Sequence, residues 1–506
     1  MRRISYPQTQ LAACEFNSSR TTTLISQWLI LVCMLGLFAL VSCDDSLETS
    51  ADKMPEFSKD TLTFDTVFTS IGSATAKILV YNRQSKPVTI DRLQLTGGGA
   101  SPFRINVDGF TDKEHLFESI TIRAKDSMYI FVEVTVNPQQ SNSPVLMRDS
   151  IVMTTREGRK RLLLEAYGQN MRVLRSLTIQ SDTLLDASLP YLIQGDLVVD
   201  TLATLRLAPG VRMYFHHNSN LMVYGHLKAI GTYEQPISLR GDRLDKIGFV
   251  TPVPYNLVAG QWGGVYLLNP QGNHVLRHVT INSGYVGVYY LNQSKQYKPT
   301  LEITNCRIQN FLFYNLVAIN GDMTVSNSAI TNSGGYTVYL NGGRHEFYHC
   351  TIANYFSNSE VQSVSRDKAP AFMMMSLPRS FPMETRVYNS VIAGSSQNEI
   401  TLASRYDSLY NAAISHSYLK RVKPSELPFY TNIRWSTPKD SLFKSIREDL
   451  TKKEYFNFMP DSVSPLRKAL ADPAIALQFP LDLNGRNRLA DGTPDAGAFE
   501  WVPDSI

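Results

Sequence analysis

The stretch HVLRHVTINS, residues 274–283, begins a series of six segments that share one pattern of apolar and polar residues. The other five are LEITNCRIQN (301–310), MTVSNSAITN (323–332), HEFYHCTIAN (345–354), TRVYNSVIAG (385–394) and DSLYNAAISH (407–416). Their starting points lie 27, 22, 22, 40 and 22 residues apart. Repetition at a period of this size is typical of solenoid proteins. The 22-residue period predicts one coil of three strands, and the two longer intervals predict a coil that carries a loop.

Two columns of the aligned segments are apolar throughout. The third position holds Leu276, Ile303, Val325, Phe347, Val387 and Leu409, and the eighth holds Ile281, Ile308, Ile330, Ile352, Ile392 and Ile414. In a parallel sheet each residue stacks on its equivalent in the next coil, so a column becomes a continuous apolar ribbon inside the solenoid. The repeats therefore predict an all-β chain built around a parallel β-helix.

The fifth column predicts a sharp turn between two sheets of the coil. It holds Asn305, Asn327, Asn389 and Asn411 in four segments, and His278 and His349 in the other two. Asparagine tolerates the left-handed backbone that such a turn requires. We interpret His278 and His349 as turn residues rather than ligands or catalytic bases. In the sixth column Cys306 and Cys350 are two coils apart, about 9.6 Å between Cα atoms, which predicts two buried free thiols.

Sequences on both sides of the repeats extend the pattern. The segments LRLAPGV (205–211), LMVYGHL (221–227) and QWGGV (261–265) precede the repeats. In this order they resemble the opening coils of pectin-lyase-like right-handed parallel β-helix proteins. The segments DLNGR (482–486) and PDAGAFE (494–500) resemble a terminal cap of such proteins. The resemblance implies a right-handed solenoid whose last coil is covered by a cap, because that coil would otherwise expose apolar surface and strand edges.

Ahead of the solenoid, residues 57–170 contain short apolar runs with a period of two, separated by turn residues. Examples are KILVY (77–81), VTIDRLQL (88–95) and YIFVEV (129–134). No window there shows the 3.6-residue period of a helix, so the region predicts a small β-sandwich. The segments 71–82 and 103–106 resemble Hydin-type immunoglobulin-like domains. That resemblance implies a spacer or docking module.

The N-terminus predicts export and lipidation. Arg2, Arg3 and Arg20 precede a short apolar run at residues 24–39, an order typical of a signal peptide. The run ends in LVSC (40–43), which resembles a lipobox, where signal peptidase cuts before a cysteine that becomes lipidated. The alternative is a plain membrane-spanning anchor, since the segment is nearly long enough to span. Lipid on Cys43 would attach the mature chain without a transmembrane helix.

The residues after Cys43 indicate the cell surface. Asp44, Asp45 and Glu48 form an acidic segment without a folding pattern, which predicts a flexible tether. This cluster resembles the surface-export signal of Bacteroidota-type lipoproteins and implies an outer-membrane location facing the exterior. Solvated linker charge is the alternative. The predicted organisation is a signal peptide (1–42), an acidic tether (43–56), an immunoglobulin-like β-sandwich (57–170), a right-handed parallel β-helix (171–420) and a C-terminal coil and cap region (421–506).

Charge and motif content exclude several classes of function. The 49 basic and 45 acidic residues include no basic block, so nucleic acid is not an expected partner. No set of Asp, Glu, His or Cys has the spacing of a metal site, and no glycine-rich phosphate loop follows a strand. We therefore expect neither a metal nor a cofactor.

One pair of carboxylates is a weak catalytic candidate. Glu302 and Glu346 share the second column of the repeat, with Thr324 in the coil between them. Two strand spacings would separate them by about 9.6 Å, close to the roughly 6.5–9.5 Å of an inverting glycosidase. The alternative is two exposed charges on a solvated face. We favour a protein without catalytic activity.

An apolar insertion between residues 358 and 383 is a candidate surface for a partner protein. It contains Phe372, Met373, Met374, Met375, Leu377 and Phe381. Methionine side chains adapt to irregular surfaces, so this segment could form a loop that grips a partner. The alternative is a segment that lies on the flank of the helix and covers a groove.

Two functions remain open from the sequence. The first is a non-catalytic, lipid-anchored surface scaffold or binding module, an accessory part of an outer-membrane protein complex. The second is a protein that binds or degrades polysaccharide, which its fold and its 25 tyrosines support.

Overall fold

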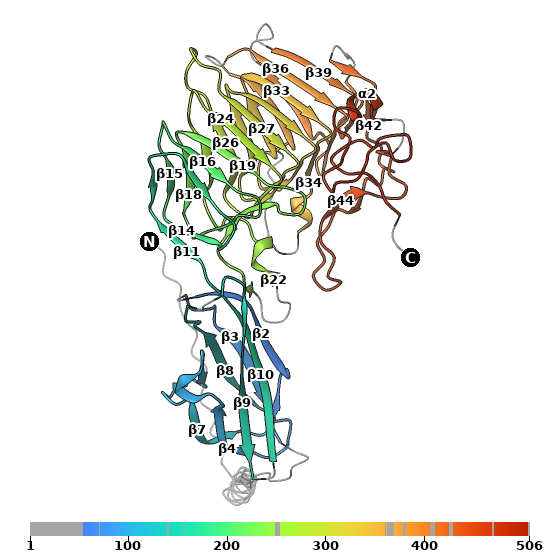
Figure 1. Cartoon of the computed structure of the whole chain (residues 1–506). Helices are drawn as coiled ribbons and strands as arrows, with labels where there is room; N and C mark the ends of the chain where they lie inside the picture. Colours follow the sequence, from blue (N-terminus) through green and yellow to red (C-terminus); the bar gives the residue numbers. More distant parts are fainter. Residues whose placement is uncertain are drawn as a thin grey trace, which may run out of the picture.

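The computed structural model describes residues 54–503, apart from residues 70, 139–140, 157, 248–252, 360, 362–368, 378–380, 405–409, 425–428 and 468–469. Strands make up almost all of the regular structure in this part of the chain. Figure 1 shows two bodies, an elongated sandwich on the N-terminal side and a long solenoid. The expected signal peptide and Cys43 lie outside the described residues. Among the residues described, no helix has the length and apolar character needed to cross a membrane.

The N-terminal body consists of two five-stranded sheets around one apolar core. The first contains, in spatial order, β1 (Glu56–Phe57), β3 (Ala76–Tyr81), β8 (Ser127–Val134), β5 (Phe103–Val107) and β6 (Phe110–Thr111). The second contains β2 (Thr61–Phe68), β10 (Gly158–Gln169), β9 (Val145–Thr155), β4 (Val88–Leu95) and β7 (Leu116–Ile122). Buried and exposed residues alternate along most of β8, so one face closes the core, as the period of two predicts.

The second body is a parallel solenoid with three long sheets. The eleven-stranded sheet contains β11 (Arg172–Arg175), β14 (Tyr191–Gln194), β17 (Arg212–Phe215), β20 (Ile237–Gly241), β25 (Val279–Asn282), β28 (Arg307–Phe311), β31 (Ala329–Ser333), β34 (Thr351–Asn354), β37 (Val391–Gly394), β40 (Tyr418–Leu419) and β42 (Arg434–Trp435). The nine-stranded sheet contains β12 (Thr178–Ile179), β15 (Leu197–Val199), β18 (Asn220–Val223), β23 (Gly264–Leu267), β26 (Val286–Leu291), β29 (Tyr314–Ile319), β32 (Val338–Asn341), β35 (Phe372–Ser376) and β38 (Ile400–Ser404).

The ten-stranded sheet forms the third side of the coil. It contains β13 (Thr183–Leu185), β16 (Thr204–Leu207), β19 (His226–Ile230), β24 (Asn273–Arg277), β27 (Thr300–Thr304), β30 (Asp322–Ser326), β33 (Gly343–Tyr348), β36 (Met383–Tyr388), β39 (Tyr410–Ser415) and β41 (Tyr430–Thr431). Short elements outside these sheets are η2 (Gly98–Ala100), β21 (Lys246–Ile247), β22 (Val253–Pro254), η3 (Tyr255–Leu257), η4 (Phe356–Asn358), β43 (Phe443–Ser445), β44 (Asn457–Pro460) and α2 (Pro473–Ala476).

Parallel pairing confirms the predicted solenoid and the register of its first five repeats. The isoleucine column is in register from coil to coil and is fully buried, running through Ile281, Ile308, Ile330, Ile352 and Ile392. The third-position column, Leu276 to Val387, is equally buried. These ribbons merge into one apolar core that extends through the solenoid.

The register expected for the sixth repeat is wrong. Val387 pairs with Ile414, and Ile392 pairs with Leu419. The sixth coil is therefore aligned five residues later than its expected start at residue 407. The third and eighth columns are both apolar and lie five positions apart. An alignment that is wrong by five residues therefore still places Ile414 in an apolar column. Ile414 instead occupies the third column.

The fifth column forms the predicted turn. Its backbone is left-handed in every coil: φ is 51° at His278, 53° at Asn305, 45° at Asn327, 48° at His349, 48° at Asn389 and 50° at His416. Amide and imidazole groups also bond between neighbouring coils, with the amide Nδ2 of Asn305 3.2 Å from Nε2 of His278 and that of Asn389 2.9 Å from Nε2 of His349. The interpretation of His278 and His349 as turn residues is confirmed, and His416 takes the place expected for Asn411.

The two cysteines behave as the coil length predicts. Cys306 and Cys350 are buried free thiols with Ser328 in the coil between them. The backbone N–H of Cys306 donates to Ser328 Oγ at 3.1 Å. Burial raises the pKa of both thiols to about 12, which makes them unreactive toward thiol reagents at neutral pH.

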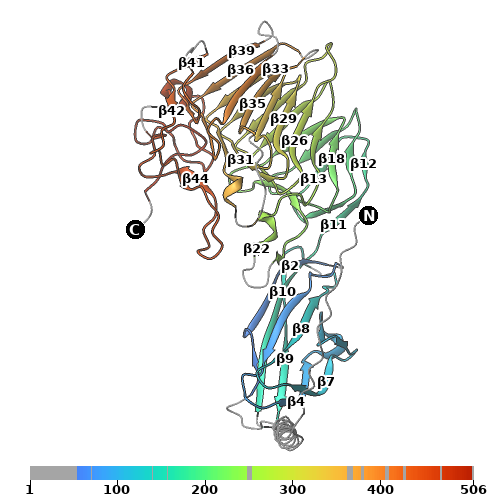
Figure 2. The ribbon, with the colours of Figure 1, turned by 180° about the vertical axis from the view of Figure 1, so that it is seen from behind.

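The methionine-rich segment is a strand of the solenoid and not a partner loop. Phe372, Met373, Met374 and Met375 lie in β35, which pairs in parallel with β32 and β38. Figure 2 shows β35 in line with the other strands of the nine-stranded sheet. Phe372 and Met374 point into the core, where they are almost inaccessible to solvent. The apolar run therefore belongs to a coil of the solenoid. Of the expected partner residues, Leu377 and Phe381 come after the strand.

The solenoid continues past residue 420, the boundary expected for its end. β41 and β42 pair with β39 and β40. Tyr430 and Trp435, whose rings meet edge to face at 5.2 Å, pack against the solenoid core. These two aromatic side chains therefore contribute to the closure of the C-terminal end, a role that the sequence had assigned to the cap motifs.

The expected cap motifs lie along the flank of the solenoid. Figures 1 and 2 both show the C-terminal region beside the later coils. Leu483 and Phe499 pack on Ala329, which belongs to a middle coil. The hydroxyl of Tyr233 donates to the carbonyl oxygen of Asp482 at 2.9 Å. The apolar side chains of the motifs bury themselves against the turn edge of the coils instead of the last coil.

Candidate functional site

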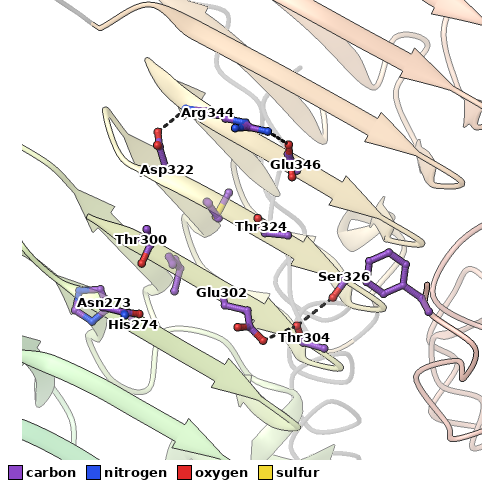
Figure 3. Close-up of a pocket in the computed structure, with 13 residues that line it drawn as sticks. Asn273, His274, Thr300, Glu302, Thr304, Asp322, Thr324, Ser326, Arg344 and Glu346 are labelled. Carbon is purple, nitrogen blue, oxygen red and sulfur yellow. Dashed lines mark hydrogen bonds and ion pairs between the residues drawn. The ribbon is translucent and has the colours of Figure 1, made fainter. Parts of the chain in front are cut away.

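A groove crosses the outer face of the ten-stranded sheet (Figure 3). Side chains of β27, β30 and β33 alternate between the core and this face, which is why the sequence neighbours of core residues reach solvent here. The groove has a volume of about 510 Å³. Its lining residues are Asn273, His274, Thr300, Leu301, Glu302, Thr304, Asp322, Met323, Thr324, Ser326, Arg344, Glu346 and Phe479.

Differences in side-chain size between neighbouring strands create the groove. The outward residues of β30 are short, with Thr324 at the centre. Glu302 on β27 and Glu346 on β33 flank Thr324 in register. Their Cα atoms are thus two strand spacings apart, about 9.6 Å, as the repeat predicts. The structure brings Glu302 and Glu346 to the same site, one on each wall.

Each carboxylate on the walls is paired with arginine. Glu302 accepts from Arg277 at 2.6 Å, and Glu346 accepts from Arg344 at 2.5 Å. Arg386 adds a second cation 3.8 Å from Glu346. The hydrogen bond to Glu346 raises the pKa of Arg344. Both carboxylates therefore act as hydrogen-bond acceptors in the groove.

Hydroxyl groups line one end of the groove. Thr304 Oγ1 and Ser326 Oγ lie 3.0 Å apart across β27 and β30, and Thr304 also donates to Glu302 at 3.3 Å. At the opposite end Asp322 accepts from the backbone N–H of Arg344 at 3.0 Å. The groove therefore offers donors and acceptors along its length, most of them on strands of the sheet.

Phe479 supplies an aromatic wall that the sequence analysis missed. It comes from the C-terminal region, and its ring stacks on Tyr348 with 5.2 Å between centroids. Tyr348 in turn stacks on Tyr388 at 5.5 Å and donates to Glu346 at 3.3 Å. No pattern in the sequence links Phe479 to the repeats. Its contact with Tyr348 joins residues 131 positions apart, and Phe479 is not part of the repeating segments.

Histidines of the first column lie beneath the groove but are not arranged for chemistry. His274 and His345 are fully buried, and burial lowers the pKa of each to about 3. His274 Nδ1 accepts from the backbone N–H of Leu227 at 3.3 Å. No group of three or more His, Cys, Asp or Glu residues in the described chain is placed to hold a metal ion. Residues Phe372–Met375, which the sequence had suggested as a surface for a partner protein, lie on the nine-stranded sheet and not at this groove.

Comparisons with known proteins give little further information. No protein-family model matches the sequence. No curated protein matches it either. The A-module of the mannuronan C-5 epimerase AlgE6 from Azotobacter vinelandii aligns at 12% identity with a TM-score of 0.24, over 54% of this chain and 83% of that one.

Two further solved structures align over shorter parts of the chain. The PapD-like domain 7 of human CEP192 aligns at 12% identity with a TM-score of 0.16, over 26% of this chain and 94% of that one. A family 123 glycoside hydrolase from Clostridium perfringens aligns at 13% identity with a TM-score of 0.17, over 24% of this chain and 26% of that one. This chain thus spans about a quarter of that hydrolase. Similarity at this level carries no argument about family or activity.

Proposed function

We propose that this protein is a lipid-anchored, non-catalytic binding module that holds a glycan in the groove over β30. The observation that carries the proposal is the groove itself, with a floor of small polar residues between two carboxylate–guanidinium pairs. Its volume of about 510 Å³ lies within the usual range of ligand pockets, about 300–1,000 Å³. Hydroxyls, carboxylates and guanidinium groups donate to and accept from the hydroxyl groups of a sugar.

The arginine pairs favour binding over cleavage. Glycoside hydrolysis requires one carboxyl group to remain protonated so that it can donate to the leaving oxygen. In the groove, Glu302 instead accepts from Arg277, and Glu346 accepts from Arg344 and Tyr348, so both carboxyl groups are occupied as acceptors. A polysaccharide-degrading enzyme remains the second candidate, because Glu302 and Glu346 face the same groove from opposite walls.

The rest of the chain fits presentation of this groove at the cell surface. In the proposal, lipid on Cys43 anchors the chain to the outer membrane, residues 43–56 form a tether, and the sandwich is an immunoglobulin-like spacer. The right-handed solenoid then faces the exterior, where it also meets an outer-membrane protein partner. Cys43→Ala should leave unprocessed precursor and abolish palmitate labelling, and persistent labelling would contradict the anchor. Protease shaving of intact cells should release the body near residues 44–56.

Filling the groove tests the binding proposal. Thr324→Trp places a large ring on the floor, and the mature protein carrying it should lose binding on a glycan array. The matched control is Thr401→Trp on the outer face of the nine-stranded sheet, where Thr401 pairs with Met373; binding should be retained. A wild-type protein that binds no glycan, or equal binding by both variants, would contradict the proposal. Cleavage products that disappear in Glu302→Gln or Glu346→Gln would establish the enzymatic alternative.

A further inference from the structure

A C-terminal segment, residues 472–501, is fastened to the turn column of the solenoid, and we call it the strap. Its first attachment is a pair of hydrogen bonds with Asn389, whose Nδ2 donates to Asp472 O at 2.9 Å and whose Oδ1 accepts from Asp472 N at 2.8 Å. Its second is Asn327, whose Nδ2 donates to Leu481 O at 3.0 Å. Both asparagines belong to the turn column, and Asn389 Nδ2 bonds to the strap in addition to His349 Nε2.

A buried ion pair locks the second attachment. Arg488 is fully buried; one guanidinium nitrogen donates to Asn327 Oδ1 at 2.9 Å and the other to Glu500 Oε1 at 2.7 Å. The carboxylate of Glu500 also accepts from the backbone N–H of Asp495. Burial lowers the pKa of Arg488 and raises that of Glu500, while the charge of each partner opposes the shift of the other. Such a pair holds its place only while both partners are present.

Phe479 lies between the two points where the strap is attached, Asp472 and Leu481, and these attachments fix the orientation of its ring. The strap enters at Asp472, passes through α2 and reaches Leu481 two residues after Phe479. The ring is thereby held against Tyr348, with 5.2 Å between ring centroids, and lines the groove. Phe479 gives the groove an aromatic side next to its polar walls, and Tyr348, stacked between Phe479 and Tyr388, supports that ring from behind.

The charges of the groove set the sign of its ligand. The lining residues include three carboxylates, on Glu302, Asp322 and Glu346, against one guanidinium, on Arg344. The neighbouring Arg277 and Arg386 are engaged in ion pairs, Arg277 with Glu302 and Arg386 with Glu384 at 2.6 Å. An anionic sugar would need a surplus of cations along this surface. The lining offers none, whereas an uncharged sugar needs only donors and acceptors.

We infer that the ligand is an uncharged glycan, one of whose pyranose rings packs its apolar face on Phe479 while its hydroxyls bond to Glu302 and Glu346. This inference rests on the proposed function and adds the ligand class and the residue that selects it. Phe479 is a specificity-determining residue, and Arg488 is a positioning residue that acts through the strap.

An array of neutral and uronic oligosaccharides of matched length tests the inference with the mature protein. Wild type should bind neutral members. Phe479→Ala should weaken that binding about tenfold, the loss of one aromatic contact, while Phe479→Tyr restores it. The matched control is Phe313→Ala, at an exposed ring on a different edge, which should bind as wild type does. Thermal unfolding of each variant checks that the fold is intact.

The outcomes separate the two proposals. A wild-type protein that binds no member of either class contradicts the proposed function itself. Wild-type binding that prefers uronic members, or neutral binding that is unchanged in Phe479→Ala, contradicts the inference and leaves the groove as a glycan site. Arg488→Met is a second, independent test. Releasing the strap should weaken the binding of neutral oligosaccharides to a similar extent as Phe479→Ala. Unchanged binding by a variant whose strap is released would also overturn the inference.

Discussion

The inner and outer columns of the ten-stranded sheet are one residue apart in sequence and have opposite roles. The inner first column, from Leu301 through Met323 to His345, is packed in the core. The adjacent outer column, Glu302 to Glu346, lines the groove. The inner column must match its neighbours in shape, because each side chain touches the coils above and below. The outer column has no such constraint. Substitutions should therefore affect stability on one side of the strand and binding on the other.

Truncation of the inner side should have the largest effect. Phe347 is fully buried, and its ring meets Phe372 of the neighbouring sheet edge to face at 5.2 Å. Phe347→Ala should lower the free energy of unfolding by about 3–5 kcal/mol, through lost burial and the cavity left behind. Denaturant unfolding measures it. The adjacent outer variant Glu346→Gln serves as the control, and a comparable loss in both would break the comparison.

The strap lies outside the coils, and its buried ion pair should rank second. Arg488→Met removes the cation that pairs with Glu500 and leaves a buried carboxylate without its partner. We expect local destabilisation of about 3 kcal/mol, seen as faster proteolysis within residues 472–501 while the solenoid remains protected. Limited proteolysis with peptide mapping follows both regions. Uniform cleavage throughout the solenoid would show that the strap is not a separate unit.

The buried histidines predict sensitivity to acid. The folded chain holds His345 neutral, with a pKa of about 3, whereas the unfolded chain takes up a proton near pH 6.5. This contribution to stability is complete above pH 6.5 and is lost as the pH falls toward 3, and the loss is about 2 kcal/mol at pH 5. His345→Met copies Met323 of the preceding coil and should flatten the pH dependence of the melting temperature.

A matched variant controls for the number of histidines. His217→Gln removes an exposed histidine at a turn and should leave the pH dependence unchanged. If His345→Met and His217→Gln change the pH dependence of the melting temperature equally, burial of His345 in the inner column is not the cause of the sensitivity to acid.

The outer carboxylates should have the smallest effect on stability. Glu302 is about two-fifths exposed in its ion pair with Arg277, and exposed pairs contribute little. Glu302→Gln should change the free energy of unfolding by less than about 0.5 kcal/mol while it weakens glycan binding. Calorimetry of the same samples gives both values. A large loss of stability would place Glu302 among the structural residues.

Local repetition explains which parts of the fold could be predicted. Ile308, Ile330 and Ile352 recur at the length of one coil, and the turn residues between the sheets recur with them. That period alone predicts the register of the strands, the burial of the Cys306 and Cys350 thiols, and the alignment of Glu302 with Glu346. The sixth repeat was misaligned because its spacing departs from 22 residues, and an apolar residue such as Ile414 satisfies either inner column.

Contacts between distant segments could not be predicted. Phe479 and Arg488 act through positions in the middle coils, and no pattern in their own neighbourhood marks them. The methionines of β35 were taken for a loop because the residues around them interrupt the repeat, although Met374 fills an ordinary inner position. Arginine partners such as Arg277 lie within the repeats, and a search of the outer columns for opposite charges would have found them.

Ligand protection of a thiol placed on the groove floor tests the central claim most directly. Thr324→Cys puts a thiol between Glu302 and Glu346, while the native Cys306 and Cys350 are buried. Peptide mass spectrometry can follow alkylation at each cysteine separately. A neutral oligosaccharide mixture should slow alkylation at position 324 several-fold and leave a Thr401→Cys control unchanged. Equal rates at position 324 with and without saccharide, or equal protection at both positions, would contradict a glycan site over β30.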